Sequence, residues 1–153
     1  MKILFAAGAF IGAVGINAAF AANEPMPQGG HHHHETGAMD TRISLGLPAQ
    51  MKLHQLSNMR EHVEAIKSIV GLMSEQKFDD ASTVAHTKLG LTPDMQSMCN
   101  MFGNESFRKL GFAFHQSGDD LGAALKTGDV NASLRALNKT MQYCVECHAT
   151  YRQ

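Results

Sequence analysis

The sequence predicts an all-α protein, an antiparallel four-helix bundle, and three observations lead to this fold class. From Pro48 onward, apolar residues recur at spacings of three and four, which is the period of a helix with one buried face. No alternating strand pattern stands out in the same region. Capping residues and glycines also divide it into segments of the length that bundle helices have.

The first helix is expected to start at Pro48, because proline suits the first turn of a helix. Six apolar residues then follow at spacings of 3, 4, 3, 4 and 3, and we expect this seam to face the core. They are Leu56, Met59, Val63, Ile66, Val70 and Met73. Leu53 and Ile69 lie off the seam and are expected to provide further apolar surface.

Capping residues delimit the later helices. Candidates for the N-caps are Asp79 or Asp80, Thr92 (followed by Pro93), Asn104 and Asp129, and the candidates for helix ends are Gly90 and Gly128. In the last helix a second seam repeats at spacings of 4, 3, 4, 3 and 4. It consists of Val130, Leu134, Leu137, Met141, Cys144 and His148.

The second seam ends in a motif with a chemical meaning. Cys144, Val145, Glu146, Cys147 and His148 form the Cys-x-x-Cys-His pattern of covalent c-type haem attachment. On a helix, residues three and four apart share one face, so both thiols can form thioethers with the haem vinyl groups. His148 can then ligate the iron. Since the motif occurs once, we expect one covalently bound haem c.

A Cys-x-x-Cys pair also occurs in dithiol oxidoreductases and in structural zinc sites. A dithiol oxidoreductase is expected near a βαβ pattern, and a structural zinc site needs two further Cys or His ligands at short spacing. Neither feature accompanies Cys144 and Cys147 in the sequence. Haem attachment is therefore the favoured interpretation.

The N-terminus predicts export. Lys2, an apolar run of about 16 residues and the Ala19-Phe20-Ala21 site are typical of a signal peptide, residues 1–21, cleaved after Ala21. The run is shorter than a spanning helix needs, so we expect no membrane span in the mature protein. Residues 22–45 are expected to be a flexible leader that contains His31 to His34, and 46–153 the bundle domain. We expect a periplasmic location, because bacteria attach haem c outside the cytoplasm.

Composition argues against several classes of function. Thirteen basic residues against fourteen acidic ones, with no basic stripe, disfavour a nucleic-acid partner. No Ser-His-Asp arrangement or carboxylate pair indicates hydrolysis, and we do not expect an enzyme.

The residues from Pro48 to Arg152 resemble the cytochrome c prime and cytochrome c556 family. The resemblance is carried by the stretch Cys-Val-Glu-Cys-His-Ala-Thr-Tyr-Arg, which ends at Arg152, and by Leu121 to Asp129 before the last helix. It implies a four-helix bundle with the haem near the C-terminus and a homodimer. Within the family, a Met on the first helix implies a low-spin electron carrier, whereas Leu or Phe there implies five-coordinate iron that binds small gases.

Comparison with the family's first helix puts Met59 at the position of the sixth iron ligand, followed by Arg60, with Phe78-Asp79 downstream. Met51 is a second choice that requires a longer spacing. His62 is one turn beyond Met59 and flanks the seam, so it could ligate iron if the helix were rotated. A Met at this spacing can also be core filler, and an open site remains an alternative.

The resemblance implies roles for two further side chains. Gln55 could reach a haem propionate. Arg152, four residues after His148, resembles the family's basic residue near the proximal imidazole, where its charge would tune the iron. Arg152 could equally be an exposed cation at a helix C-terminus.

Cys99 lies among Met95, Met98 and Met101, and such soft ligands suit Cu(I), although a buried apolar cysteine is the simpler interpretation. The leading functional hypothesis is a monohaem electron carrier that serves periplasmic redox partners with His148 and Met59 as ligands. A five-coordinate cytochrome c prime that binds nitric oxide or carbon monoxide is the alternative. A copper-handling module that uses Cys99 and His31 to His34 is the third.

Overall fold

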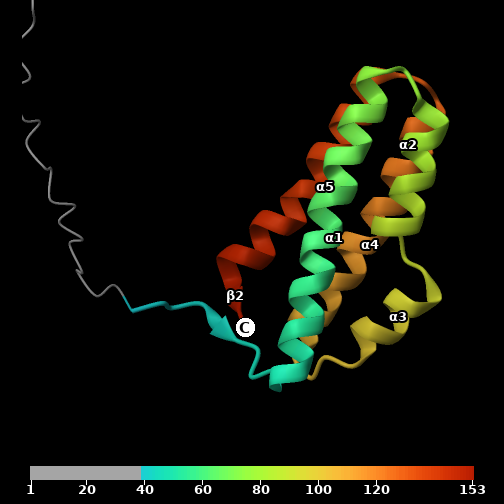
Figure 1. Ribbon diagram of the computed structural model, residues 1–153. Helices are drawn as coiled ribbons and strands as arrows, with labels where there is room; N and C mark the ends of the chain where they lie inside the picture. Colours follow the sequence, from blue (N-terminus) through green and yellow to red (C-terminus); the bar gives the residue numbers. More distant parts are fainter. Residues whose placement is uncertain (1–38) are drawn as a thin grey trace, which may run out of the picture. The chain divides into compact units, whose positions relative to one another are not determined.

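The computed structural model describes residues 39–153, and these form one compact unit, Met39–Gln153. Four helical segments pack together, as the sequence predicts: α1 (Ala49–Ser74), α2 (Phe78–Val84) with its π-helical extension η1 (Ala85–Leu89), α4 (Glu105–Lys126) and α5 (Val130–Thr150). The short helix α3 (Pro93–Asn100) lies at the end of the bundle that also holds the C-terminus (Figure 1). Short turns make neighbouring helices alternate in direction.

The predicted caps explain where most helices begin. The side chains of Thr92, Asn104 and Asp129 accept hydrogen bonds from backbone N–H groups in the first turns of α3, α4 and α5. Gly128, in the turn between α4 and α5, has a φ of 71°, a conformation that glycine adopts without steric cost. These boundary predictions are confirmed. The prediction that Asp79 or Asp80 caps a helix is wrong, because α2 (Phe78–Val84) begins one residue earlier and both lie in its first turn.

The prediction of which face of α1 is buried is wrong, because the helix is rotated about its axis relative to the predicted seam. The buried residues of α1 are Gln55, His62, Ala65, Ile69 and Met73. Of the predicted seam, Met73 is buried and Met59 and Ile66 are half-buried, but Leu56, Val63 and Val70 are exposed. Ile69, which the sequence predicts off the seam, is fully buried.

The same error occurs in α5, where Val130, Leu134 and Met141 of the predicted seam are exposed. Leu137 and Cys144 of the predicted seam do face inward, and Ser133, Thr140 and Cys147 complete the inward line at spacings of 4, 3, 4 and 3. The hydroxyl of Thr140 donates to the carbonyl oxygen of Ser117 at 3.1 Å. Small polar residues thus occupy core positions because their hydroxyls hydrogen-bond across to α4.

A short parallel strand pair adds to the predicted helices. Strand β1 (Ile43–Ser44) pairs with β2 (Tyr151–Arg152), in the register Ile43 to Tyr151 and Ser44 to Arg152. The amide of Leu45 donates to the carbonyl oxygen of Arg152 at 2.9 Å. Residues that the sequence assigns to the leader therefore bind the end of the chain directly after the Cys-x-x-Cys-His motif.

Two glycines of α4 set how closely α2 and η1 approach it. A Cβ at Gly118 would collide with the carbonyl oxygen of Leu89 and lie 2.9 Å from the Leu89 Cβ. One turn on, the hydroxyl of Ser82 donates to the carbonyl oxygen of Gly122 at 2.8 Å. Leu89, Ser82 and Leu121 are completely buried at this contact, so it is part of the core.

We therefore expect Gly118→Ala to destabilise the fold by about 1–3 kcal/mol, because backbone rather than a flexible side chain occupies the space. Gly71→Ala is the matched control, since nothing lies within 4 Å of its added Cβ. In α1 that substitution should stabilise by about 0.5–1 kcal/mol. Chemical unfolding followed by circular dichroism measures both, and equal midpoints for the two variants would contradict the close approach.

Candidate functional site

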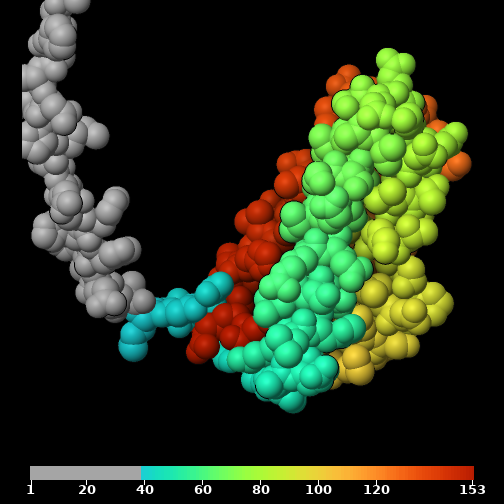
Figure 2. Space-filling view, viewed as in Figure 1, coloured from blue at the N-terminus to red at the C-terminus, as the bar shows by residue number. Residues whose placement is uncertain are grey.

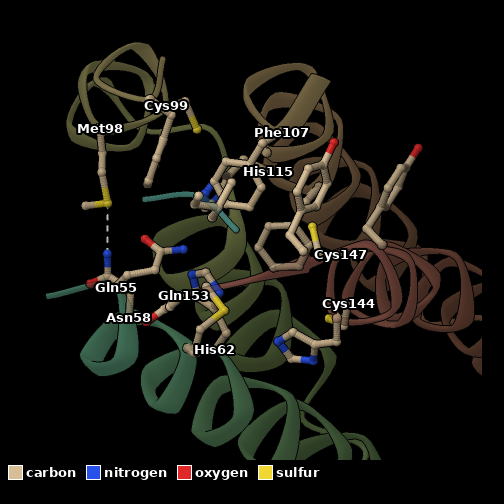
Figure 3. A pocket seen from close by; sticks show the side chains of 18 of the residues that line it. Gln55, Asn58, His62, Met98, Cys99, Phe107, His115, Cys144, Cys147 and Gln153 are labelled. Carbon is tan, nitrogen blue, oxygen red and sulfur yellow. Dashed lines mark hydrogen bonds between the residues drawn. The ribbon is translucent and has the colours of Figure 1, made fainter. Parts of the chain in front are cut away.

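A large pocket opens between α1 and α5 at the end of the bundle that carries the motif. It encloses about 1060 Å³ of empty space, part of which is open to solvent. Helix α4 forms its back wall, α3 contributes Met95, Met98 and Cys99, and Leu45 and Tyr151 line it near the strand pair. Figure 3 shows side chains from these elements pointing into one space. The site therefore brings together segments from both ends of the described chain.

The α5 wall carries the motif. Cys144, Cys147 and His148 all line the pocket, and the two thiols point into it from α5 (Figure 3). Both cysteines are half-buried, and His148 is exposed. One face of α5 thus presents two thiols and an imidazole to a cavity, which is the placement that the spacing predicts.

The α1 wall, across the pocket, carries Gln55, Asn58, Met59 and His62. Gln55 and His62 are each only 8 % exposed, whereas Met59 is half-buried. Because α1 is rotated relative to the predicted seam, His62 lies at the middle of its buried face and Met59 lies at the edge of that face. Met51 is not among the residues that line the pocket.

Aromatic side chains of α4 hold the His62 ring. Its centroid lies 4.9 Å from that of Phe114 and 5.5 Å from that of His115. Burial, together with the nearby His115, lowers the pKa of His62 to about 4. His62 is therefore a neutral imidazole at neutral pH, and a ring nitrogen keeps a free lone pair.

His115 is fixed differently. Its Nδ1 lies 2.9 Å from the carbonyl oxygen of Leu89, and a carbonyl can only accept, so Nδ1 carries the proton and donates. Burial lowers the pKa of His115 as well. This bond satisfies the His115 ring within the core. The sequence does not reveal that its ring supports the pocket.

The motif thiols are held in their neutral form. Burial is the first cause that raises the pKa of Cys144 and of Cys147, and for Cys147 the charges of Cys144 and Glu146 raise it further, to about 11. Catalytic dithiols have a lowered thiol pKa, so this environment disfavours the oxidoreductase alternative.

An ion cluster fastens the end of α5. Arg42 donates from Nε and Nη2 to the Asp40 carboxylate at 2.9 and 2.8 Å, and its Nη1 donates to the carbonyl oxygen of His148 at 3.2 Å. Arg152 lies 3.8 Å from the same carboxylate. The Arg42 guanidinium lowers the pKa of Asp40 to about 2. Arg152 belongs to β2, since α5 ends at Thr150, and it lines the pocket.

Helix α3 covers the pocket from one side with sulfur-bearing residues. The Nδ2 of Asn58 lies 2.8 Å from the Met98 sulfur, which ties α3 to α1. Cys99 is buried, and burial raises the pKa of its thiol. Within residues 39–153, no three His, Cys, Asp or Glu side chains converge as a metal site would require. His31 to His34 and the predicted signal peptide lie outside the described residues.

The structure thus brings Cys144, Cys147, His148, Met59, Gln55 and Arg152 to one pocket. Sequence reasoning missed Arg108 and Leu45, which also line it. Arg108 follows the cap of α4 by one turn, and no pattern separates it from a surface cation. Leu45 lies in the segment taken for a leader.

Comparisons of the chain with protein-family models, with curated proteins and with solved structures found no match. Within the described residues, no helix is both long enough and apolar enough to cross a membrane.

The raised thiol pKa values predict slow alkylation. In the folded, haem-free protein, Cys144 and Cys147 should react with iodoacetamide at pH 8 more slowly than in urea, because less thiolate is present. The rate for Cys147 should rise as the pH approaches about 11. Mass spectrometry of time points measures each site. Faster reaction in the folded protein at pH 7 would instead indicate an activated dithiol.

Proposed function

We propose that this protein is a periplasmic monohaem c-type cytochrome of the cytochrome c prime and c556 type that transfers electrons. The observation that carries the proposal is that Cys144, Cys147 and His148 of α5 all line the same pocket. The proposed haem c would be held by thioether bonds from the two cysteines and by His148 as an axial ligand.

The residues that line the pocket suit this group. Much of the lining is apolar, including Ile66, Phe107 and Phe114. The lining also includes polar side chains that could pair with carboxylates: Gln55, Asn58, Arg108 and Arg152. An apolar pocket with donors on two opposing walls accommodates a flat macrocycle that carries two carboxylates.

The chain's own residues would then favour electron transfer. When bound, the haem supplies a one-electron couple. A second iron ligand from α1, in addition to His148, would keep the coordination constant between the two oxidation states. Met59 is the ligand that the family resemblance implies, and His62 is the other nitrogen or sulfur donor of α1 that lines the pocket. Met59 and His62 lie on α1 and His148 lies on α5, so all three donors belong to helices rather than to loops.

Export to the periplasm follows in this proposal from the signal-like residues 1–21, which places the thiols where haem c is attached. The redox partners would be other periplasmic proteins. The gas-binding alternative requires that no side chain of α1 occupy the sixth position.

We further propose association of two copies through α1. Its outer face exposes Leu53, Leu56, Val63 and Val70, a stripe of apolar side chains at helical spacing. In Figure 2 no other part of the described chain crosses the front of α1. Ile69, which the sequence predicts to lie on this surface, is fully buried and does not belong to the stripe.

Covalent attachment is tested by expression with a haem c maturation system. One haem-stained band should persist in a denaturing gel near the mass of the chain, and Cys144→Ala with Cys147→Ala should abolish it. Cys99→Ala is the matched control and should keep the stain, since Cys99 is outside the motif. Haem that acid-acetone extracts from the unmutated protein would contradict thioether attachment.

The dimer is tested by light scattering at micromolar concentration. We expect twice the chain mass, and Leu53→Lys with Val70→Lys should give a monomer, because two charges then interrupt the apolar stripe. The control is Leu134→Lys on α5, which is exposed to the same extent as Val70 but lies outside the stripe. An unmutated protein that is monomeric would remove the dimer and leave the haem proposal intact.

A further inference from the structure

We infer that His62, rather than Met59, is the side chain of α1 that binds the iron opposite His148. This inference rests on the proposed haem site and names its second axial ligand. It starts from the rotation of α1, which turns His62 into the pocket and moves Met59 toward its edge.

The helix geometry ranks the two candidates. At 100° per residue, Met59 points roughly 60° away from His62 around the axis of α1. Gln55 and Ile69, which are seven residues from His62 in each direction, are both buried and mark the inward direction. His62 therefore lies on the line that faces the pocket, and Met59 lies beside it.

The ring nitrogens of His62 face the pocket without a protein partner. Only 8 % of the residue is exposed, yet within residues 39–153 its ring nitrogens are not among the fully buried atoms that lack a hydrogen bond, so they remain accessible from the pocket that His62 lines. The neighbouring His115 differs, since its Nδ1 is bound to the carbonyl oxygen of Leu89. A nitrogen of His62 is therefore available to bind an iron ion in the pocket.

The ring of His62 is preorganised as a ligand. Phe114 and His115 on α4 contact it at centroid distances of 4.9 and 5.5 Å. These contacts already restrict the ring, so binding a metal would cost little side-chain entropy. Figure 3 shows His62 on α1, with Cys144 and Cys147 across the pocket on α5. Met59, by contrast, is half-buried and has an unbranched, flexible side chain, which suits it to fill space beside a cofactor.

Two imidazole ligands have a different signature from an imidazole and a thioether. A bis-histidine ferric centre is low-spin but lacks the near-infrared sulfur-to-iron band. Its reduction potential is also lower, because a methionine ligand raises the potential. Both properties can be read from the purified holoprotein without any redox partner.

The experiment uses the full chain with its covalent haem and three variants, Met59→Leu, His62→Ala and His62→Met. The unmutated protein should be six-coordinate without the sulfur band, and Met59→Leu, the variant that tests the competing ligand, should remain six-coordinate and low-spin. His62→Ala should become high-spin, and its reduced form should bind carbon monoxide about tenfold faster or more, because a tethered competitor is gone. His62→Met should restore six coordination, gain the sulfur band and raise the potential.

Three results would overturn the inference. The first is a sulfur band in the unmutated protein that Met59→Leu removes, which assigns the ligand to Met59. The second is an unmutated protein that is already five-coordinate and unchanged by His62→Ala, which favours gas binding. The third is a six-coordinate spectrum that neither single substitution alters. All three leave covalent haem in place, whereas a protein without attached haem would overturn the proposed function itself. His62→Met retains a bulky side chain at this buried position, so the test survives if His62→Ala fails to fold.

Discussion

The close approach of α2 and α5 to α4 is the constraint on which the rest of the structure depends. At Gly118, η1 comes so near that no side chain fits between the backbones. Hydroxyls of Ser82 and Thr140 bond to carbonyl oxygens of α4 on its two sides. Backbones can pack this tightly only through small residues, and a small residue at each contact fixes which faces of α2, α4 and α5 turn inward. The pocket then opens where these contacts stop and α5 leaves α1 (Figure 1).

That constraint explains which part of the fold could be predicted from the sequence. Helix number and boundaries follow from local signals, namely the caps at Asn104 and Asp129 and the turn at Gly128, and these depend on few residues. Which face of each helix is buried depends on its contacts with the other helices. Hydrophobic periodicity assigns Leu134 and Met141 to the core, yet Ser133 and Thr140 are buried in their place. A pattern of apolar residues cannot show that a hydroxyl will find a carbonyl partner on another helix.

The candidate site divides in the same way. The motif on α5 is local, and its spacing alone predicts that Cys144 and Cys147 share a face. The opposite wall depends on the rotation of α1, so the sequence ranks Met59 above His62 and the structure gives the more buried position to His62. Leu45 could not be found at all, because pairing of β1 with β2 joins residues more than 100 positions apart. Long-range pairings of this kind leave no short pattern in the sequence.

The strand pair gives the pocket a support that the bundle does not provide. The last carbonyls of a helix lack partners within it, and Arg42 donates to one of them, that of His148. Arg42 is in turn held by Asp40, whose pKa it lowers from 3.8 to about 2. A carboxylate with a lowered pKa contributes stability above its ordinary value near 3.8, and that contribution disappears as the pH falls toward 2. Because the carboxylate is exposed, solvent and salt screen it, and its stabilising effect is small. The main effect of the ion pair is to position the chain. Asp40 stays ionised around neutral pH, so the pair with Arg42 keeps the segment before β1 against the end of α5. The imidazole of His148 therefore extends from a helix end that is anchored rather than frayed.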